Sequence, residues 1–208
     1  MPPTLAEARV AFIKSLKASE RSPGTLALYE RCLKELEDWL TANDQALAVD
    51  AIESRHITDF PLYLAERPKR QGHGYRSKPE GLLATETKRH YHRVMSSFFN
   101  WCQREGLLNG HMPMRNIKKP RPEHKEIRTL SDQEVKRFLD LLHQPEAKKR
   151  TLYVAFSLMY KLGLRISEVC NLRLSDLNLE TGRLFVQGKG KKERELPIRN
   201  GVDKMLEA

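Results

Sequence analysis

The sequence predicts a mainly α-helical protein in two parts, a domain of four helices followed by the opening of an α+β domain. Three observations lead to this fold class. Apolar residues recur at intervals of three or four through residues 5–105, as they do on amphipathic helices. A basic segment with two prolines, 118–125, interrupts that pattern and indicates a linker. Beyond it, further helical segments give way to two short apolar runs on either side of a glycine-containing turn.

The four helices of the first part are recognised from apolar spacing and from turn residues. One face of the first helix is formed by Leu5, Ala8, Phe12 and Leu16. The turn Ser22-Pro23-Gly24-Thr25 breaks the chain and caps a second helix over 25–42. A third helix is expected over 56–66 and a fourth over 84–105. Together they make a compact helical domain.

Composition shifts set the expected domain limits. We expect a helical domain over 1–117, a linker over 118–128 and a second domain over 129–208. Within the helical domain, residues 67–81 are rich in Pro, Gly, His, Lys and Arg and are expected to form a mobile loop.

The second part begins with a helix start that the sequence marks clearly. Ser131 and Glu134 have the spacing of a capping box. A helix near 147–162 and a short one over 166–172 are expected to follow. Two short strands complete the part, 183–187 and 195–198, joined by a turn over 188–194.

The charge balance favours a polyanionic partner. The 208 residues include 37 basic and 27 acidic side chains, a formal net charge of +10, and each phosphate that such a surface neutralises releases a counterion. Single, distant cysteines without a C-x-x-C pair argue against a disulfide framework or a zinc site: Cys32, Cys102 and Cys170. No apolar run approaches a membrane span and the start lacks the order of a signal peptide, so we expect a cytoplasmic protein.

The connection between two helices holds the first candidate site residue, Arg165. Gly163 ends the preceding helix and Ser167 can help to cap the next, so Arg165 is expected close to a helix N-terminus. Backbone N–H groups and the guanidinium there would point the same way, which suits a phosphate. Glu168 could orient that guanidinium. Taken alone, an ordinary surface Arg–Glu pair explains this spacing better.

The second candidate, Lys189, lies in the run Gly188-Lys189-Gly190-Lys191-Lys192. Such a run is usually a solvated hairpin tip, in which glycines supply positive φ. It is not a P-loop, because the required spacing is absent and the segment joins strands. As a functional element, its glycines would allow close approach of a nucleic-acid backbone and its lysine would reach that backbone.

Two motifs, separated by a distance along the chain that is typical of one protein family, make the functional prediction specific. They run from Gly163-Leu164-Arg165-Ile166-Ser167-Glu168 to Gly188-Lys189-Gly190-Lys191-Lys192-Glu193-Arg194. With Ser22-Pro23-Gly24-Thr25 and Ser97-Phe98-Phe99-Asn100-Trp101 upstream, the sequence resembles the tyrosine recombinases of the phage integrase and Xer type. The resemblance implies a four-helix SAM-like core-binding domain followed by the N-terminal part of an α+β catalytic domain.

The resemblance also implies roles for single residues. Arg165 is similar to the first catalytic arginine, which clamps the scissile phosphate, and Glu168 to the acidic residue that supports it. Lys189 is similar to the hairpin lysine that protonates the leaving 5′ oxygen. Double-stranded DNA and other recombinase protomers are the implied partners. No cofactor, metal, membrane or small-molecule substrate is implied.

The family pattern continues beyond the lysine with a His-x-x-Arg helix and a tyrosine nucleophile, which the 208 residues do not supply in that order. The expectation is therefore a truncated recombinase that binds DNA and does not cleave it alone. A non-catalytic regulator or competitor at recombination sites, and an inert decay product, are the alternatives. His90 and Arg93 have His-x-x-Arg spacing but lie upstream, so we interpret that match as chance. Tyr153 and Tyr160 are expected in the core.

Two basic groups are expected to contact DNA. From Arg67 to Arg93 there are eight basic and two acidic residues. On the fourth helix the candidates, on the side away from its apolar residues, are Thr85, Lys88, Arg89, His92 and Arg93. By analogy with the family this helix faces the major groove. Lys118, Lys119 and Arg121 of the linker are expected to follow the phosphate backbone of the DNA. A protein that binds DNA in this way is expected to be associated with the nucleoid.

Overall fold

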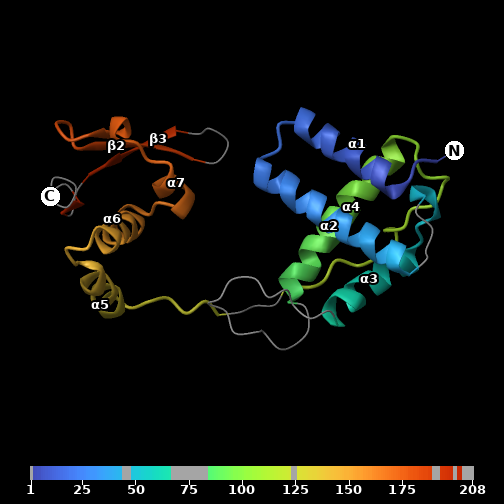
Figure 1. Ribbon diagram of the computed structural model, residues 1–208, viewed down its shortest axis with the longest axis horizontal. Helices are drawn as coiled ribbons and strands as arrows, with labels where there is room; N and C mark the ends of the chain where they lie inside the picture. The colour runs from blue at the N-terminus through green and yellow to red at the C-terminus, as the bar shows by residue number, and fades with distance from the viewer. Residues whose placement is uncertain are drawn as a thin grey trace. The chain divides into compact units, whose positions relative to one another are not determined.

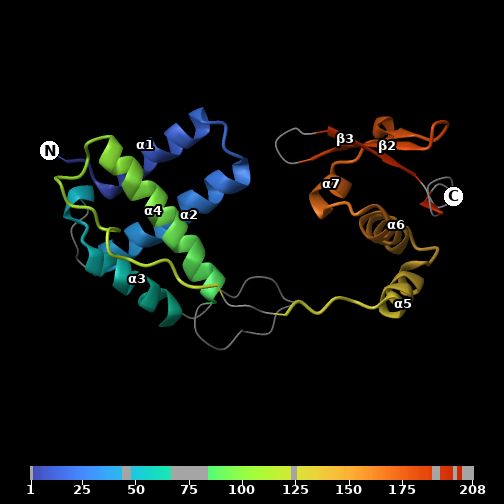
Figure 2. The same ribbon diagram turned by 180° about the vertical axis from the view of Figure 1, so that it is seen from behind.

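The chain folds as two units, Met1–Lys125 and Glu126–Ala208 (Figures 1 and 2). The structure, a computed structural model, describes residues 2–43, 48–66, 84–122, 126–188, 193–198 and 201–202. The predicted loop over 67–81 and the candidate Lys189 lie outside these residues. The boundary between the units falls within the segment 118–128, while the domain limits given above stay a prediction.

The first unit is helical, as its apolar spacing predicts. Its elements are α1 (Leu5–Ala18), α2 (Pro23–Ala42), the single 3-10 turn η1 (Val49–Ala51), α3 (Ser54–Glu66) and α4 (Thr85–Arg104). The second helix begins two residues earlier than predicted, because Ser22 is the N-cap and Pro23 occupies the first turn. The Ser22 side chain accepts a hydrogen bond from the backbone N–H of Thr25 at 3.3 Å.

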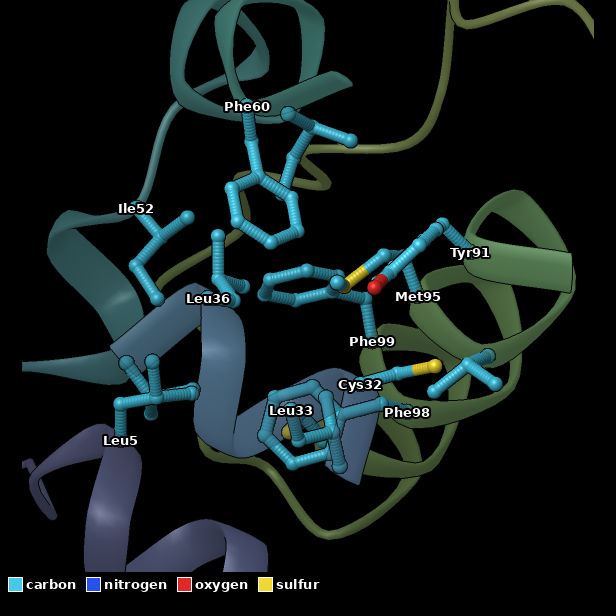
Figure 3. Close-up of a cluster of buried hydrophobic side chains, with 14 of the residues drawn as sticks. Leu5, Cys32, Leu33, Leu36, Ile52, Phe60, Tyr91, Met95, Phe98 and Phe99 are labelled. Atoms are coloured by element: carbon cyan, nitrogen blue, oxygen red, sulfur yellow. The ribbon is translucent and has the colours of Figure 1, made fainter. Parts of the chain in front are cut away.

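One apolar core holds the four helices of this unit together. α2 contacts α1, α3 and α4, and α4 also contacts α1 and α3. Figure 3 shows side chains from all four helices pointing into the same cluster, with Phe98 and Phe99 of α4 at its centre. The Phe98 ring meets the Phe12 ring edge-on, with centroids 5.4 Å apart. The core face of α4 therefore fixes the orientation of that helix.

The second unit combines three helices with a small antiparallel sheet. The helices are α5 (Asp132–Leu142), α6 (Ala147–Leu162), α7 (Ile166–Cys170) and the 3-10 turn η2 (Leu174–Asp176). The described strands are β1 (Leu177–Asn178), β2 (Arg183–Gln187) and β3 (Glu193–Pro197), in the order β1-β2-β3. Ser131 and Glu134 form the predicted capping box at the start of α5. A second core unites α6, α7 and the sheet, with Leu158, Leu164, Leu184, Val186, Ile198 and Val202 buried.

Two boundaries in this unit differ from prediction, and two short elements were not predicted. α7 ends at Cys170, two residues early, and the short elements η2 and β1 have no counterpart among the predicted segments. β3 begins at Glu193, so Arg194 belongs to a strand and not to the turn. Its pairing explains why, since Arg194 lies opposite Val186 and Glu193 opposite Gln187 in an unbroken antiparallel ladder.

Gly163 ends α6 as predicted, and its backbone conformation makes a side chain costly there. Its φ is +63°, in the left-handed region that glycine adopts without penalty. No atom lies within 4 Å of where a Cβ would stand, so the cost comes from the backbone alone. We expect Gly163→Ala to destabilise the second unit by about 1 kcal/mol. Urea denaturation followed by amide exchange would measure this, with Gly24→Ala, at ordinary φ and in open space, as the control.

Candidate functional site

The centre of the candidate site is the carboxylate of Glu168, on which two arginines converge. Its side chain is only 3% exposed. From Arg165 it accepts hydrogen bonds from the backbone N–H at 2.8 Å and from Nη1 at 2.9 Å. From Arg194 it accepts two more, from Nη1 at 2.8 Å and from Nη2 at 2.9 Å. A carboxylate has about four acceptor positions, so all of them are filled.

A short turn between α6 and α7 places Arg165 and Glu168 in this arrangement. Gly163 reverses the backbone after α6, and Leu164 is buried in the second core. Arg165 is the N-cap of α7, which places Glu168 one turn later with its carboxylate directed back toward the Arg165 N–H. The prediction that Ser167 helps to cap this helix is wrong, because Glu168 provides the cap.

Arg165 presents part of its guanidinium to solvent while the rest is held. Its side chain is 70% exposed although Nη1 is hydrogen-bonded to Glu168. Within the described ranges, Nε and Nη2 have no hydrogen-bond partner. The Arg165 backbone N–H donates to Glu168, so this one N–H group is not available to a ligand beside the guanidinium. What remains is a fixed, exposed fork of N–H donors, which suits a phosphate oxygen.

The two arginines keep the Glu168 carboxylate charged. The hydrogen bonds from Arg194, then the one from the Arg165 backbone, lower the pKa of Glu168 from 4.5 to about 2. The same contact with Glu168 raises the pKa of Arg194. Two positive charges and one negative charge meet here, so the cluster carries a net charge of +1 at neutral pH.

Arg194 was not among the predicted site residues, although the sequence contains a signal for it. In β3, Arg194 and Leu196 are half-buried and alternate with exposed neighbours, so both face inward. An arginine at an inward strand position needs an acidic partner. The predicted second cation, Lys189, lies in the connection between β2 and β3, outside the described residues.

The predicted DNA-binding residues of α4 lie beside the core face of that helix. Arg93 is exposed, whereas Thr85, Lys88, Arg89 and His92 are partly buried. Arg89 donates from Nη1 to Glu86 at 2.7 Å. The ring of His92 contacts the carbonyl oxygen of Ile117 through Nε2, at 3.1 Å. His92 thus joins α4 to Ile117, the residue just before the predicted linker, and Arg93 is the most accessible cation of the group.

The remaining predicted residues are the linker cations and two tyrosines of α6. Lys118, Lys119 and Arg121 are exposed on irregular backbone. The prediction that Tyr160 lies in the core is wrong. Its side chain is about half exposed, and its hydroxyl donates to Asp132 at 2.9 Å, which ties α6 to α5. Tyr153 is partly buried against the ring of His143.

In the part of the chain that the structure describes, no three His, Cys, Asp or Glu side chains are grouped so that they could hold a metal ion. None of the helices in the described ranges is long and apolar enough to cross a bilayer.

Comparison with known sequences identifies relatives over most of the chain. Residues 128–208 match the phage integrase family. The chain is 30% identical over 185 residues to tyrosine recombinase XerC of Escherichia coli, covering 87% of this chain and 55% of that protein. It is 36% identical over 118 residues to a tyrosine recombinase of Thermosipho africanus, covering 56% of this chain and 40% of that protein. The chain thus spans about half the length of these curated relatives, or less.

Solved structures share the fold. A lambda integrase dimer bound to a COC′ core site matches with a TM-score of 0.72 and 15% identity, over 99% of this chain and 53% of that one. A lambda integrase tetramer bound to a Holliday junction matches with a TM-score of 0.73 and 17% identity, over 99% of this chain and 56% of that one. These matches confirm the predicted mainly α fold class.

Sequence and fold agree on one class of protein, the integrases of the phage type. The chain belongs to the tyrosine recombinase family, as its two motifs predicted.

Proposed function

We propose that this protein binds duplex DNA as part of site-specific recombination and holds a scissile phosphodiester with Arg165 and Lys189. The observation that carries the proposal is the state of Arg165, a guanidinium fixed by a buried carboxylate yet 70% exposed. A purely structural arginine would direct all its donors inward. Here part of the fork faces outward, in a cluster of net charge +1.

The proposed chemistry is electrostatic stabilisation of phosphoryl transfer. Negative charge grows on the non-bridging and leaving oxygens as the phosphodiester reacts, and fixed cations stabilise that charge. Arg165 would hold a non-bridging oxygen through its outward N–H groups. A tyrosine hydroxyl, which the family pattern places beyond the lysine, would form the new bond to phosphorus. Lys189 would give a proton to the 5′ oxygen as its bond to phosphorus breaks, the role that the family resemblance implies for it. Glu168 would touch no substrate and act by holding Arg165.

The relatives support the nature of the partner. The matched lambda integrase structures contain DNA, as a core site in a dimer and as a Holliday junction in a tetramer. We propose duplex DNA and further copies of a recombinase as the partners of this chain, in the cytoplasm at the nucleoid. The exposed Arg93, Lys118, Lys119 and Arg121 would contact phosphates beside the reacting one.

The first experiment removes the outward charge of Arg165. If Arg165 contacts one phosphate, Arg165→Gln makes the slope of log affinity against log salt shallower by about 0.9, which is roughly eightfold in affinity at 0.1 M salt. Fluorescence anisotropy with a labelled 30-base-pair duplex, over a salt series, measures both quantities. Arg183→Gln is the matched control, because it removes one charge from β2 in the same unit. Equal slopes for wild type and Arg165→Gln would exclude the phosphate contact.

The second experiment tests the α4 surface. We expect the double change Lys88→Gln with Arg93→Gln to reduce the same slope by about 1.8, since two phosphate contacts are lost. The control pair Lys34→Gln and Arg55→Gln removes equal charge from α2 and α3, where the side chains are 50% and 65% exposed. An equal loss in both pairs would mean that net charge, and not the α4 face, attracts the DNA.

Together the two experiments distinguish a recombination protein that holds the scissile phosphodiester from a protein that only binds DNA. A non-catalytic regulator that occupies recombination sites would depend on the α4 surface and not on Arg165. That alternative is favoured if only the Lys88 and Arg93 changes weaken binding.

A further inference from the structure

Arg194 is the last residue of the second motif, and the proposed phosphate contact gives it no role. It projects inward from β3, opposite Val186 in the ladder, and its side chain is 36% exposed. Both of its Nη atoms donate to Glu168, one to each carboxylate oxygen. The described part of the chain therefore binds two arginines to one buried carboxylate, from two elements that are separate in sequence. Figures 1 and 2 show α7 beside the end of the sheet at which β3 begins.

We propose that Arg194 is a positioning residue, which acts through Glu168 to hold Arg165 with its outer N–H groups directed away from the carboxylate. The inference rests on the proposed function, because it explains how Arg165 is kept ready for a phosphate. Arg194 itself would touch no substrate.

The first support is the saturation of the carboxylate. Oε1 accepts from Nη1 of each arginine, and Oε2 accepts from the Arg165 backbone and from Nη2 of Arg194. Because about four acceptor positions are then full, Arg165 cannot turn its second N–H edge onto Glu168. Without Arg194, two positions become free, and a bidentate pair between Arg165 and Glu168 becomes the favoured geometry. That pair would direct the Arg165 donors inward.

The second support is the charge count. With Arg194 present, the cluster has two cations for one anion. The positive charge of Arg165 is then not fully neutralised and can attract a phosphate. With Arg194 removed, Arg165 and Glu168 form a neutral pair, and the attraction for a phosphate falls.

The third support is mechanical. Arg194 connects β3 to the start of α7, and α7 is a helix of only five residues. A single turn of helix has little stability of its own. The bidentate contact from the sheet, together with buried Leu164, fixes where that turn begins and thus where Arg165 stands.

The test compares Arg194→Gln and Arg194→Lys with Arg183→Gln, in the full 208-residue chain. Arg183 is the matched control, since it lies in the same hairpin and its Nε is 3.8 Å from Glu195, not near Glu168. The Nε–H resonance of Arg165 and the carboxyl titration of Glu168 are followed by NMR. We expect Arg194→Gln to move the Arg165 resonance and to raise the pKa of Glu168 from about 2, with Arg183→Gln unchanged. Arg194→Lys keeps the positive charge but not the two Nη groups that contact both oxygens of Glu168. We expect it to change the Arg165 resonance and the pKa of Glu168 less than Arg194→Gln does.

Salt-dependent DNA binding gives the functional measurement. Arg194→Gln should lose as much affinity as Arg165→Gln, roughly eightfold at 0.1 M salt, and the double variant should lose no more than Arg165→Gln alone. Additive losses would mean that Arg194 contacts DNA directly, and would overturn the inference. So would Arg194 variants that are folded, by their amide spectrum, and leave the Arg165 resonance and the binding unchanged.

Failure of the inference can be distinguished from failure of the proposed function. If Arg165→Gln binds DNA like wild type, the phosphate contact is excluded. The NMR measurements still decide whether Arg194 positions Arg165. If Arg165→Gln weakens binding and Arg194→Gln does not, the phosphate contact stands and the positioning role is rejected.

Discussion

Glu168→Gln is expected to be the most damaging single change in the second unit. The amide keeps the shape of the carboxylate but not its charge, so the guanidinium groups of Arg165 and Arg194 lose their shared counter-ion and repel one another. We expect the melting temperature of this unit to fall by roughly 10 °C. Amide exchange at Leu184 and Val186, both buried in the second core, measures the effect. Tryptophan fluorescence does not, because Trp39 and Trp101 lie in the first unit.

The pH dependence of this contribution has a definite sign. The pKa of Glu168 is lowered by folding, from 4.5 to about 2. The stabilisation is therefore complete above pH 4.5 and is lost as the pH falls toward 2, because the unfolded chain takes up the proton first. Wild type should lose stability across that window, and Glu168→Gln should lose less. Glu195→Gln, an exposed acid paired with Arg183 at 3.8 Å, is the control and should behave like wild type. Identical pH profiles for wild type and Glu168→Gln would contradict the assignment.

Phe98→Ala is expected to have the largest effect on the first unit. Phe98 is fully buried, and its ring lies 5.4 Å from that of Phe12 and 5.1 Å from that of Phe99 between centroids. Removing it leaves a cavity where α1 and α4 meet, at a cost of about 3–5 kcal/mol. That is a large part of the stability of an ordinary domain. Urea denaturation followed by the fluorescence of Trp101 measures the loss.

Leu62→Ala provides the matched control for this change. Leu62 is 61% exposed on α3, so the same kind of truncation there should change stability by no more than about 0.5 kcal/mol. Comparable losses for Phe98→Ala and Leu62→Ala would mean that the core does not depend on the ring of Phe98. Loss of the first unit should also abolish binding through the α4 surface, since the core face of α4 orients its cations.

Much of this fold follows from local rules that are visible in the sequence. Apolar spacing placed the helices of the first unit, and the Ser131–Glu134 box placed the start of α5. Gly163 marked the end of α6, because only a residue tolerant of positive φ ends a helix in this way. The missed elements, η2 and β1, are three and two residues long. Segments that short carry no periodicity, so nothing local distinguishes them from loop.

The candidate site was likewise predicted only in part from the sequence. Arg165 and Glu168 are three residues apart, so their contact is a local one and the sequence predicted it. The partner that saturates the carboxylate, Arg194, is 26 residues from Glu168, and only the return of β3 beside α7 brings it there. The sequence by itself determined the helices, the net charge and the motif that carries Arg165. The tertiary structure decided that Glu168 holds both Nη atoms of Arg194 while Arg165 faces outward, because hydrogen bonds between distant elements depend on how the chain packs.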